Sequence, residues 1–161
     1  MLHPTAQRVA AAARELGLEI VIKEFTETTR TAEDAANAIG CTVAQIVKSL
    51  LFVVDGRPTI ALVSGPNRLD EAKLAALCCV GKNKVKRADA DTVREATGFA
   101  IGGVPPFGHA TRLPVYIDQD FWQFEVIWAA AGTPNAVFAI TPADLAKATG
   151  GVMVDLKVLS A

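Results

Sequence analysis

A segment rich in glycine and proline, Thr97 to His109, holds the densest group of residues that could shape a binding site. Its thirteen residues include four glycines, two adjacent prolines and a histidine, which excludes a continuous helix or a central strand. Gly102 and Gly103 lack side chains, so the backbone can adopt positive φ there and bring main-chain N–H groups close to a ligand. The segment therefore predicts a shaped loop that grips a small polar group. A tight turn between two strands is the simpler interpretation of the glycine pair.

Three further features could contribute to the same site. Lys48 lies within an apolar, β-rich run, where it either faces solvent or points into a pocket. A second glycine turn includes Gly132 and Thr133. Together these groups could form a pocket in which N–H groups stabilise an oxyanion and the lysine binds a phosphate or a carbonyl. His109 either points into this pocket or caps the loop.

The chain lacks the motifs of several common enzyme classes. It has no P-loop, no nucleophile elbow, no zinc-protease helix and no dinucleotide fingerprint. Its two histidines and three cysteines do not form the cluster that a zinc site needs. We therefore expect neither a metal nor a cofactor.

Composition limits the partners. The 161 residues suit one compact domain spanning residues 1–161, and a net charge of −1 gives no general affinity for polyanions or specific affinity for DNA. Any nucleic-acid contact must be local, and the one dense basic run supplies Lys82, Lys84, Lys86 and Arg87. These side chains either contact phosphates or form a solvated strand edge. Unpaired cysteines and the lack of a leader or membrane span predict a cytoplasmic protein.

Hydrophobic periodicity and capping residues predict the helices and strands. Helices are expected at residues 5–16, 31–39, 69–78, 89–97 and 141–149. Strands are expected at 18–25, 46–54, 59–64, 82–87, 113–118, 123–130, 136–140 and 151–159, and a threonine-rich link at 26–30. Aromatic residues 122, 124 and 128 alternate along one strand, which is more typical of core than of a stacking platform.

Strands and helices do not alternate strictly, which disfavours a doubly wound parallel sheet. We therefore expect an α/β (α+β) fold: a single domain with a mixed, curled, barrel-like β-sheet and helices packed around it.

Four segments resemble the YbaK/prolyl-tRNA-synthetase-associated domain in order and spacing. They are the Lys48 strand with its Asp-Gly turn, Gly65 to Leu74, the loop from Thr97 to Gly108, and Gly132 to Asn135. The resemblance covers nearly the whole chain. It implies a free-standing, metal-independent editing deacylase that hydrolyses the ester between a wrong amino acid and tRNA, most often tRNAPro. Its implied partners are the aminoacyl-tRNA acceptor end and prolyl-tRNA synthetase, and we expect a monomer or a weak homodimer.

The resemblance also implies roles for individual residues. Lys48, Gly102 and Gly103 match the catalytic positions, where the lysine holds the 3′-terminal nucleotide and the glycine backbone approaches the scissile carbonyl. Water activation is credited to the terminal ribose hydroxyl and to backbone groups rather than to a side-chain base. The expected substrate-binding residues are Thr31, Ser64, Phe107, His109, Gly132, Thr133 and Asn135, and the basic run is expected to bind tRNA.

The chain departs from some relatives at three positions. Phe25 and Val137 are apolar where some relatives carry a polar residue, and Pro105 replaces a frequent serine. These differences indicate a pocket adapted to another side chain, and alanine, serine, threonine, cysteine and 2-aminobutyrate all stay candidates. A non-catalytic module that binds tRNA or a nucleotide in the same pocket is the alternative function.

Overall fold

The computed structural model describes residues 2–26 and 31–159, so residues 27–30 of the predicted link lie outside the described part. The helices are α1 (Pro4–Glu15), α2 (Ala32–Ile39), α3 (Glu71–Leu77), α4 (Ala90–Thr97) and α5 (Pro142–Thr149). The strands are β1 (Ile22–Glu24), β2 (Val47–Val54), β3 (Arg57–Ser64), β4 (Val85–Arg87), β5 (Val115–Asp118), β6 (Ile127–Ala130), β7 (Ala136–Ile140) and β8 (Val152–Val154). Short 3-10 helices are η1 (Val43–Gln45), η2 (Lys82–Lys84) and η3 (Gln119–Gln123).

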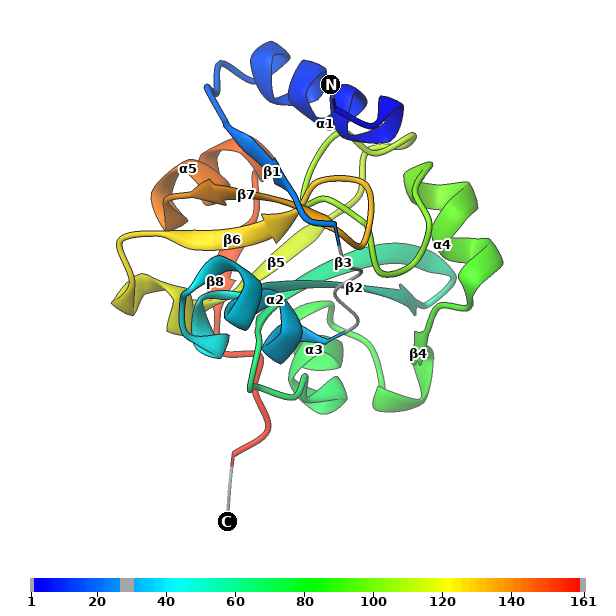
Figure 1. Cartoon of the computed structure of the whole chain (residues 1–161). Coiled ribbons are helices and arrows are strands. Elements are labelled where there is room, and N and C mark those ends of the chain that lie inside the picture. Colours follow the sequence, from blue (N-terminus) through cyan, green and yellow to red (C-terminus); the bar gives the residue numbers. More distant parts are fainter. Residues whose placement is uncertain (1, 27–30, 160–161) are drawn as a thin grey trace.

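The strands form two sheets (Figure 1). The larger has the order β4-β2-β3-β5-β8, with antiparallel pairing from β4 to β3 and parallel pairing from β3 to β8. The smaller has the order β1-β7-β6 and is antiparallel. The mixed α/β class is therefore confirmed.

The expected barrel-like closure is not supported. Among the described residues, one isolated parallel bridge, between Ile46 and Trp128, links the two sheets. Beyond this bridge, β2 and β6 do not pair, and residues from both strands line the cavity described below. The sheets therefore stay separate because a cavity lies between two strand edges that a barrel would join.

Two hydrophobic clusters lie on opposite faces of the larger sheet. Val47, Leu51, Ile60 and Leu62 face the cluster shared with α1, α4, α5 and the smaller sheet. The second cluster lies between the sheet and α3 and takes alternate residues of the same strands, Phe52, Val54, Ala61 and Val63 (Figure 1). This is the period-two alternation of a strand buried on both faces. Within the described residues, no helix is long and apolar enough to cross a membrane.

Most predicted elements are confirmed, and their caps explain their bounds. Thr31 accepts the N–H of Asp34 at the start of α2, and Gly40 ends that helix in the left-handed conformation. The predicted strand at 123–130 is wrong in its first half. β6 begins only at Ile127, and the preceding 3-10 helix η3, which Asp118 caps, takes up Gln123 and the exposed Trp122.

The loop from Gly98 to His109 is held from within. Thr97 is buried, and its hydroxyl donates to the Val93 carbonyl while accepting the N–H of Phe99. Nε2 of His109 lies 2.6 Å from the carbonyl oxygen of Pro105. Since a carbonyl only accepts, Nε2 carries the proton and donates. His109 therefore caps the loop, which was one of the two alternatives.

The two glycine turns meet backbone to backbone. A Cβ atom on Gly103 would lie 2.7 Å from the carbonyl oxygen of Gly132 and 2.9 Å from Cα of Thr133. Gly132 has a φ of +96° and packs against the main chain of Thr5 in α1. The spacing between the turns thus requires glycine at position 103, and the positive φ and the contact with Thr5 require it at position 132.

We expect Gly103→Ala to lower the free energy of unfolding by about 1–3 kcal/mol, because the new methyl group must push two backbone segments apart. Urea unfolding with an unchanged m-value would measure this loss. Gly81→Ala is the control. Gly81 has a φ of −72°, which alanine adopts without strain, and a Cβ atom there would meet only the side chain of Asn83. An equal effect of the two substitutions would contradict the backbone contact.

We also expect His109 to make stability depend on pH. Burial lowers the pKa of His109, although its hydrogen bond to Pro105 opposes the shift. As pH falls below about 6.5, the ordinary imidazole value, the unfolded chain binds a proton that the folded chain does not. The stabilisation is therefore complete above that pH and is lost toward the lower folded-state pKa. Urea unfolding at pH values from 8 to 5 should show that the free energy of unfolding falls more steeply in His3→Gln than in His3→Gln/His109→Gln, where no histidine remains. An equal dependence of the free energy of unfolding on pH in the two variants would refute the role of His109.

Candidate active site

A cavity of about 360 Å³ lies between the edge of β2, β6, the start of α2 and the glycine-proline loop. This volume is in the range of small-ligand sites. Its lining combines a few polar groups with many apolar ones: Thr31, Ala32, Ala35, Ile46, Val47, Lys48, Ser49, Leu50, Arg87, Ile101, Gly102, Val104, Trp128, Ala129, Ala130, Pro134, Ala136 and Val137. The structure therefore brings Lys48, Gly102 and Thr31 to one cavity.

Lys48 provides the half-buried cation of the site. Its Nζ donates to the main-chain oxygen of Asn67 at 2.6 Å. Burial lowers the pKa of Lys48, the positive charge of Arg87 lowers it further, and Asp118 opposes both. A partly desolvated ammonium interacts strongly with an anionic or carbonyl oxygen, because little water screens it.

The edge of β2 contributes main-chain groups as well. On the edge that faces β4, the carbonyl of Leu51 accepts the N–H of Ala88, and the N–H of Asp55 donates to the carbonyl of Lys84. Since main-chain polar groups alternate between the two edges of a strand, those of Ser49 point to the same side, away from β3 and toward the cavity. The Ser49 hydroxyl is buried and has no hydrogen-bond partner among the described residues. Sequence reasoning missed Ser49, and no signal in the chain marks it.

Gly102 and Gly103 play different parts. Gly102 has a φ of +90°, and a Cβ atom there would have nothing within 4 Å. Its N–H has no hydrogen-bond partner among the described residues. The N–H of Gly103 instead donates to Ala100 within the turn, and Gly103 does not line the cavity. Gly102 is therefore the member of the pair whose N–H is available to a ligand.

Several predicted substrate-binding residues hold the scaffold. The Ser64 hydroxyl donates to the carbonyl of Ala44 at 2.6 Å. Phe107 is buried, and its ring lies 5.5 Å from that of Phe138. Together with His109, which bonds to the loop, these residues are outside the cavity lining.

The second glycine turn also acts mainly through structure. Thr133 donates its hydroxyl proton to the Asn135 side-chain oxygen, and Asn135 Nδ2 donates to the Phe25 carbonyl. Gly132, Thr133 and Asn135 are not in the cavity lining, but Pro134 of the same turn is. The turn therefore reaches the cavity through its proline.

Trp128 and Arg87 complete the walls. Trp128 was interpreted as core, yet it lines the cavity, with Nζ of Lys23 5.0 Å from its ring centroid. Lys82, Lys84 and Lys86 are exposed along η2 and the edge strand β4. Arg87, at the end of that strand, reaches the cavity. The basic run thus leads from solvent to the rim.

Comparisons with known proteins agree with this architecture. The family model of the aminoacyl-tRNA editing domain matches residues 26–148. A crystal structure described as a candidate trans-editing enzyme for prolyl-tRNA synthetase has a TM-score of 0.93 and 46% sequence identity, covering 98% of this chain and 99% of that one.

Two relatives come from bacteria. The protein YwhH of Bacillus subtilis, which is described as uncharacterized, is 33% identical over 127 residues, or 78% of this chain and 79% of that protein. The proline–tRNA ligase of Elusimicrobium minutum is 30% identical over 145 residues, which cover 89% of this chain but 25% of the ligase. The match of the family model to most of the residues means that this chain belongs to the aminoacyl-tRNA editing domain family.

Proposed function

We propose that this protein deacylates mischarged aminoacyl-tRNA in trans, with tRNAPro carrying a small wrong amino acid as its substrate. The observation that carries the proposal is the single cavity that joins the Lys48 ammonium, the free N–H of Gly102 and an apolar wall. Family membership and the likeness to a candidate trans-editing enzyme support it. The acceptor end of the tRNA is the proposed partner, and prolyl-tRNA synthetase is a second one.

The proposed roles follow from the chemistry of ester hydrolysis. Lys48 binds the phosphate of the terminal nucleotide, and Arg87 at the rim adds a second cation. The Gly102 N–H donates to the ester carbonyl oxygen, which gains negative charge as water attacks. Breaking the ester bond then releases the amino acid and restores the ribose hydroxyl.

We propose that the substrate supplies the base. No carboxylate, imidazole or thiol is among the described residues that line the cavity. The vicinal ribose hydroxyl lies next to the ester in any aminoacyl-tRNA and can assist removal of a proton from the attacking water. The protein then contributes position and electrostatic stabilisation, without a metal or a cofactor.

The apolar part of the cavity lining suggests which amino acid is removed. Ala35, Ile46, Trp128 and Val137 form an apolar surface that suits a methyl or ethyl side chain. We therefore rank alanine and 2-aminobutyrate ahead of serine, threonine and cysteine. A hydrophobic pocket discriminates only weakly against an added hydroxyl, by about a hundredfold at most.

Single-turnover hydrolysis of tRNAPro charged with each of these five amino acids tests the proposal. We expect alanine and 2-aminobutyrate to be released about 10–100 times faster than serine or threonine. Correctly charged prolyl-tRNAPro serves as the control, and each assay is run with and without prolyl-tRNA synthetase. If no ester is hydrolysed while the protein still binds tRNA, the alternative of a non-catalytic binding module is favoured.

Lys48→Ala should reduce kcat/KM about 10²–10³-fold, as expected when a preorganised electrostatic contact is lost. Lys86→Ala is the matched control, because this exposed lysine lies on the neighbouring strand outside the cavity. Its effect should be a few-fold and should vanish at high salt. Circular dichroism and thermal unfolding establish that both variants fold. Near wild-type rates in Lys48→Ala would remove Lys48 from the site.

A further inference from the structure

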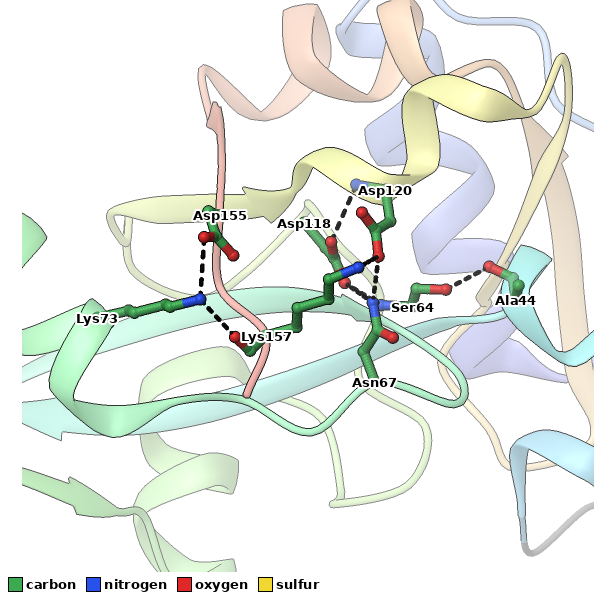
Figure 2. Close-up of polar contacts among 8 residues, drawn as sticks. All are labelled: Ala44, Ser64, Asn67, Lys73, Asp118, Asp120, Asp155 and Lys157. Carbon is green, nitrogen blue, oxygen red and sulfur yellow. Dashed lines mark hydrogen bonds and ion pairs between the residues drawn. The ribbon is translucent and has the colours of Figure 1, made fainter. Parts of the chain in front are cut away.

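A polar network around Asn67 joins three segments that are distant in sequence (Figure 2). Asn67 lies between β3 and α3, Asp118 and Asp120 lie where β5 meets η3, and Lys157 follows β8. Nδ2 of Asn67 is 2.8 Å from both Asp118 Oδ2 and Asp120 Oδ2. Nζ of Lys157 is 2.9 Å from Asp120 Oδ2.

The side chain of Asn67 is fixed by these bonds. A primary amide carries two N–H donors, and both are used on carboxylates. Asp118 is itself buried and also accepts the main-chain N–H of Ser64 at 3.0 Å, so it is a rigid anchor. The same Asn67 offers its main-chain oxygen to Nζ of Lys48. The anchored side chain therefore restrains the main chain of the same residue, whose N–H donates to the Ser64 carbonyl and whose own carbonyl holds the lysine.

Lys157 offsets the charge of this arrangement. Two carboxylates that share one neutral amide repel each other. The Lys157 hydrogen bond lowers the pKa of Asp120, and Asp120 in turn raises the pKa of Lys157. Lys157 lies beyond residues 26–148, which the family model matches. The segment after β8 thus adds a cation to a network that reaches the cavity.

We propose that Asn67 is a positioning residue for Lys48, and that Asp120 and Lys157 fix Asn67 in the orientation that this requires. The inference rests on the proposed function, in which Lys48 must be held in place to bind the substrate. A lysine side chain has many rotamers, and a fixed acceptor holds the ammonium at the cavity before the substrate arrives.

A double-mutant cycle tests whether Asn67 acts through Lys48. Asn67→Ala should lower kcat/KM about tenfold, as expected for disturbing a hydrogen bond to a charged group. Asn67→Ala/Lys48→Ala should be no slower than Lys48→Ala alone, since the positioned group is gone. Multiplicative effects in the double variant, or a rate for Asn67→Ala within twofold of wild type, would overturn the proposal.

The contribution of Lys157 has a matched control in Lys73. Both lysines hold the segment after β8, because Lys73 pairs with Asp155 and donates to the carbonyl of Lys157. Of these two, Lys157 is the one bonded to the Asn67 network (Figure 2). Lys157→Met should lower kcat/KM several-fold, Lys157→Arg should retain activity, and Lys73→Met should match wild type. Equal losses in Lys157→Met and Lys73→Met would assign the effect to anchoring of the segment and overturn the role of Lys157.

An NMR titration of the Lys48 ammonium separates this inference from the proposed function. Arg87 and Asp118 are the charged groups that act on Lys48. Both remain in Asn67→Ala, where Asp118 loses the hydrogen bond from Asn67 and keeps the one from the Ser64 N–H. The main-chain carbonyl of residue 67 remains in that variant but is no longer held by side-chain bonds, so the charged form should lose stabilisation and the pKa of Lys48 should fall. An unchanged pKa would overturn the inference whether or not the wild type hydrolyses any aminoacyl-tRNA. Conversely, a lowered pKa in a protein without hydrolytic activity would leave the positioning role standing and reject the deacylase.

Discussion

The uncovered edge of β2 is the constraint from which the site follows. β3 pairs with the whole length of this strand, whereas β4 covers only Phe52 to Val54 on the other edge. Unpaired main-chain groups at a strand edge attract either another strand or a ligand. The edge is surrounded by α2, β6 and the glycine-proline loop, none of which pairs with it beyond the bridge at Ile46. The result is a cavity whose lining includes polar groups of β2. The open edge therefore accounts both for the missing barrel closure and for the binding site.

Placing Lys48 at this edge has a cost. Moving an ammonium out of water is unfavourable unless hydrogen bonds compensate, and burial is the largest cause of its lowered pKa. The Asn67 carbonyl supplies one strong acceptor, and the buried carboxylate of Asp118 supplies a favourable field. At the glycine-proline loop, Gly103 packs on Gly132 and leaves Gly102 facing open space. The cation is thus kept near an empty volume rather than being satisfied fully by the protein.

Local chemistry explains which parts of the fold could be predicted from the sequence. The Asp55-Gly56 turn, the threonine caps and the glycine helix ends act within a few residues, and these elements form where predicted. The alternation of aromatic residues predicted a strand that includes Trp122, but the Asp118 cap, a local signal of another kind, places Trp122 in a 3-10 helix. The sheet closure was wrong because it depends on whether β2 and β6 continue to pair, which neither strand encodes alone.

The candidate site divides in the same way. Lys48, Gly102 and Thr31 were predicted and line one cavity. Ser64, Phe107 and His109 carry equally suggestive chemistry, but their partners are Ala44, Phe138 and Pro105, and two of these contacts are set by tertiary packing. Ser49 was not singled out and Trp128 was interpreted as core, because an apolar run and an alternation of aromatic residues are both typical of a buried strand.

Because no side-chain base is among the described residues that line the cavity, selection of the substrate depends on how the ester is positioned. On the proposed chemistry the reacting groups belong to the substrate and to water, so the rate depends on how well Lys48 and Gly102 hold the ester. Misplacement by about 1 Å can cost a hundredfold in rate. A side chain too large for the wall formed by Ala35, Ile46 and Val137 would shift the ester away from both polar contacts. The same wall that admits a methyl group would thereby protect a correctly charged, bulkier amino acid from hydrolysis, without a separate device for rejecting it.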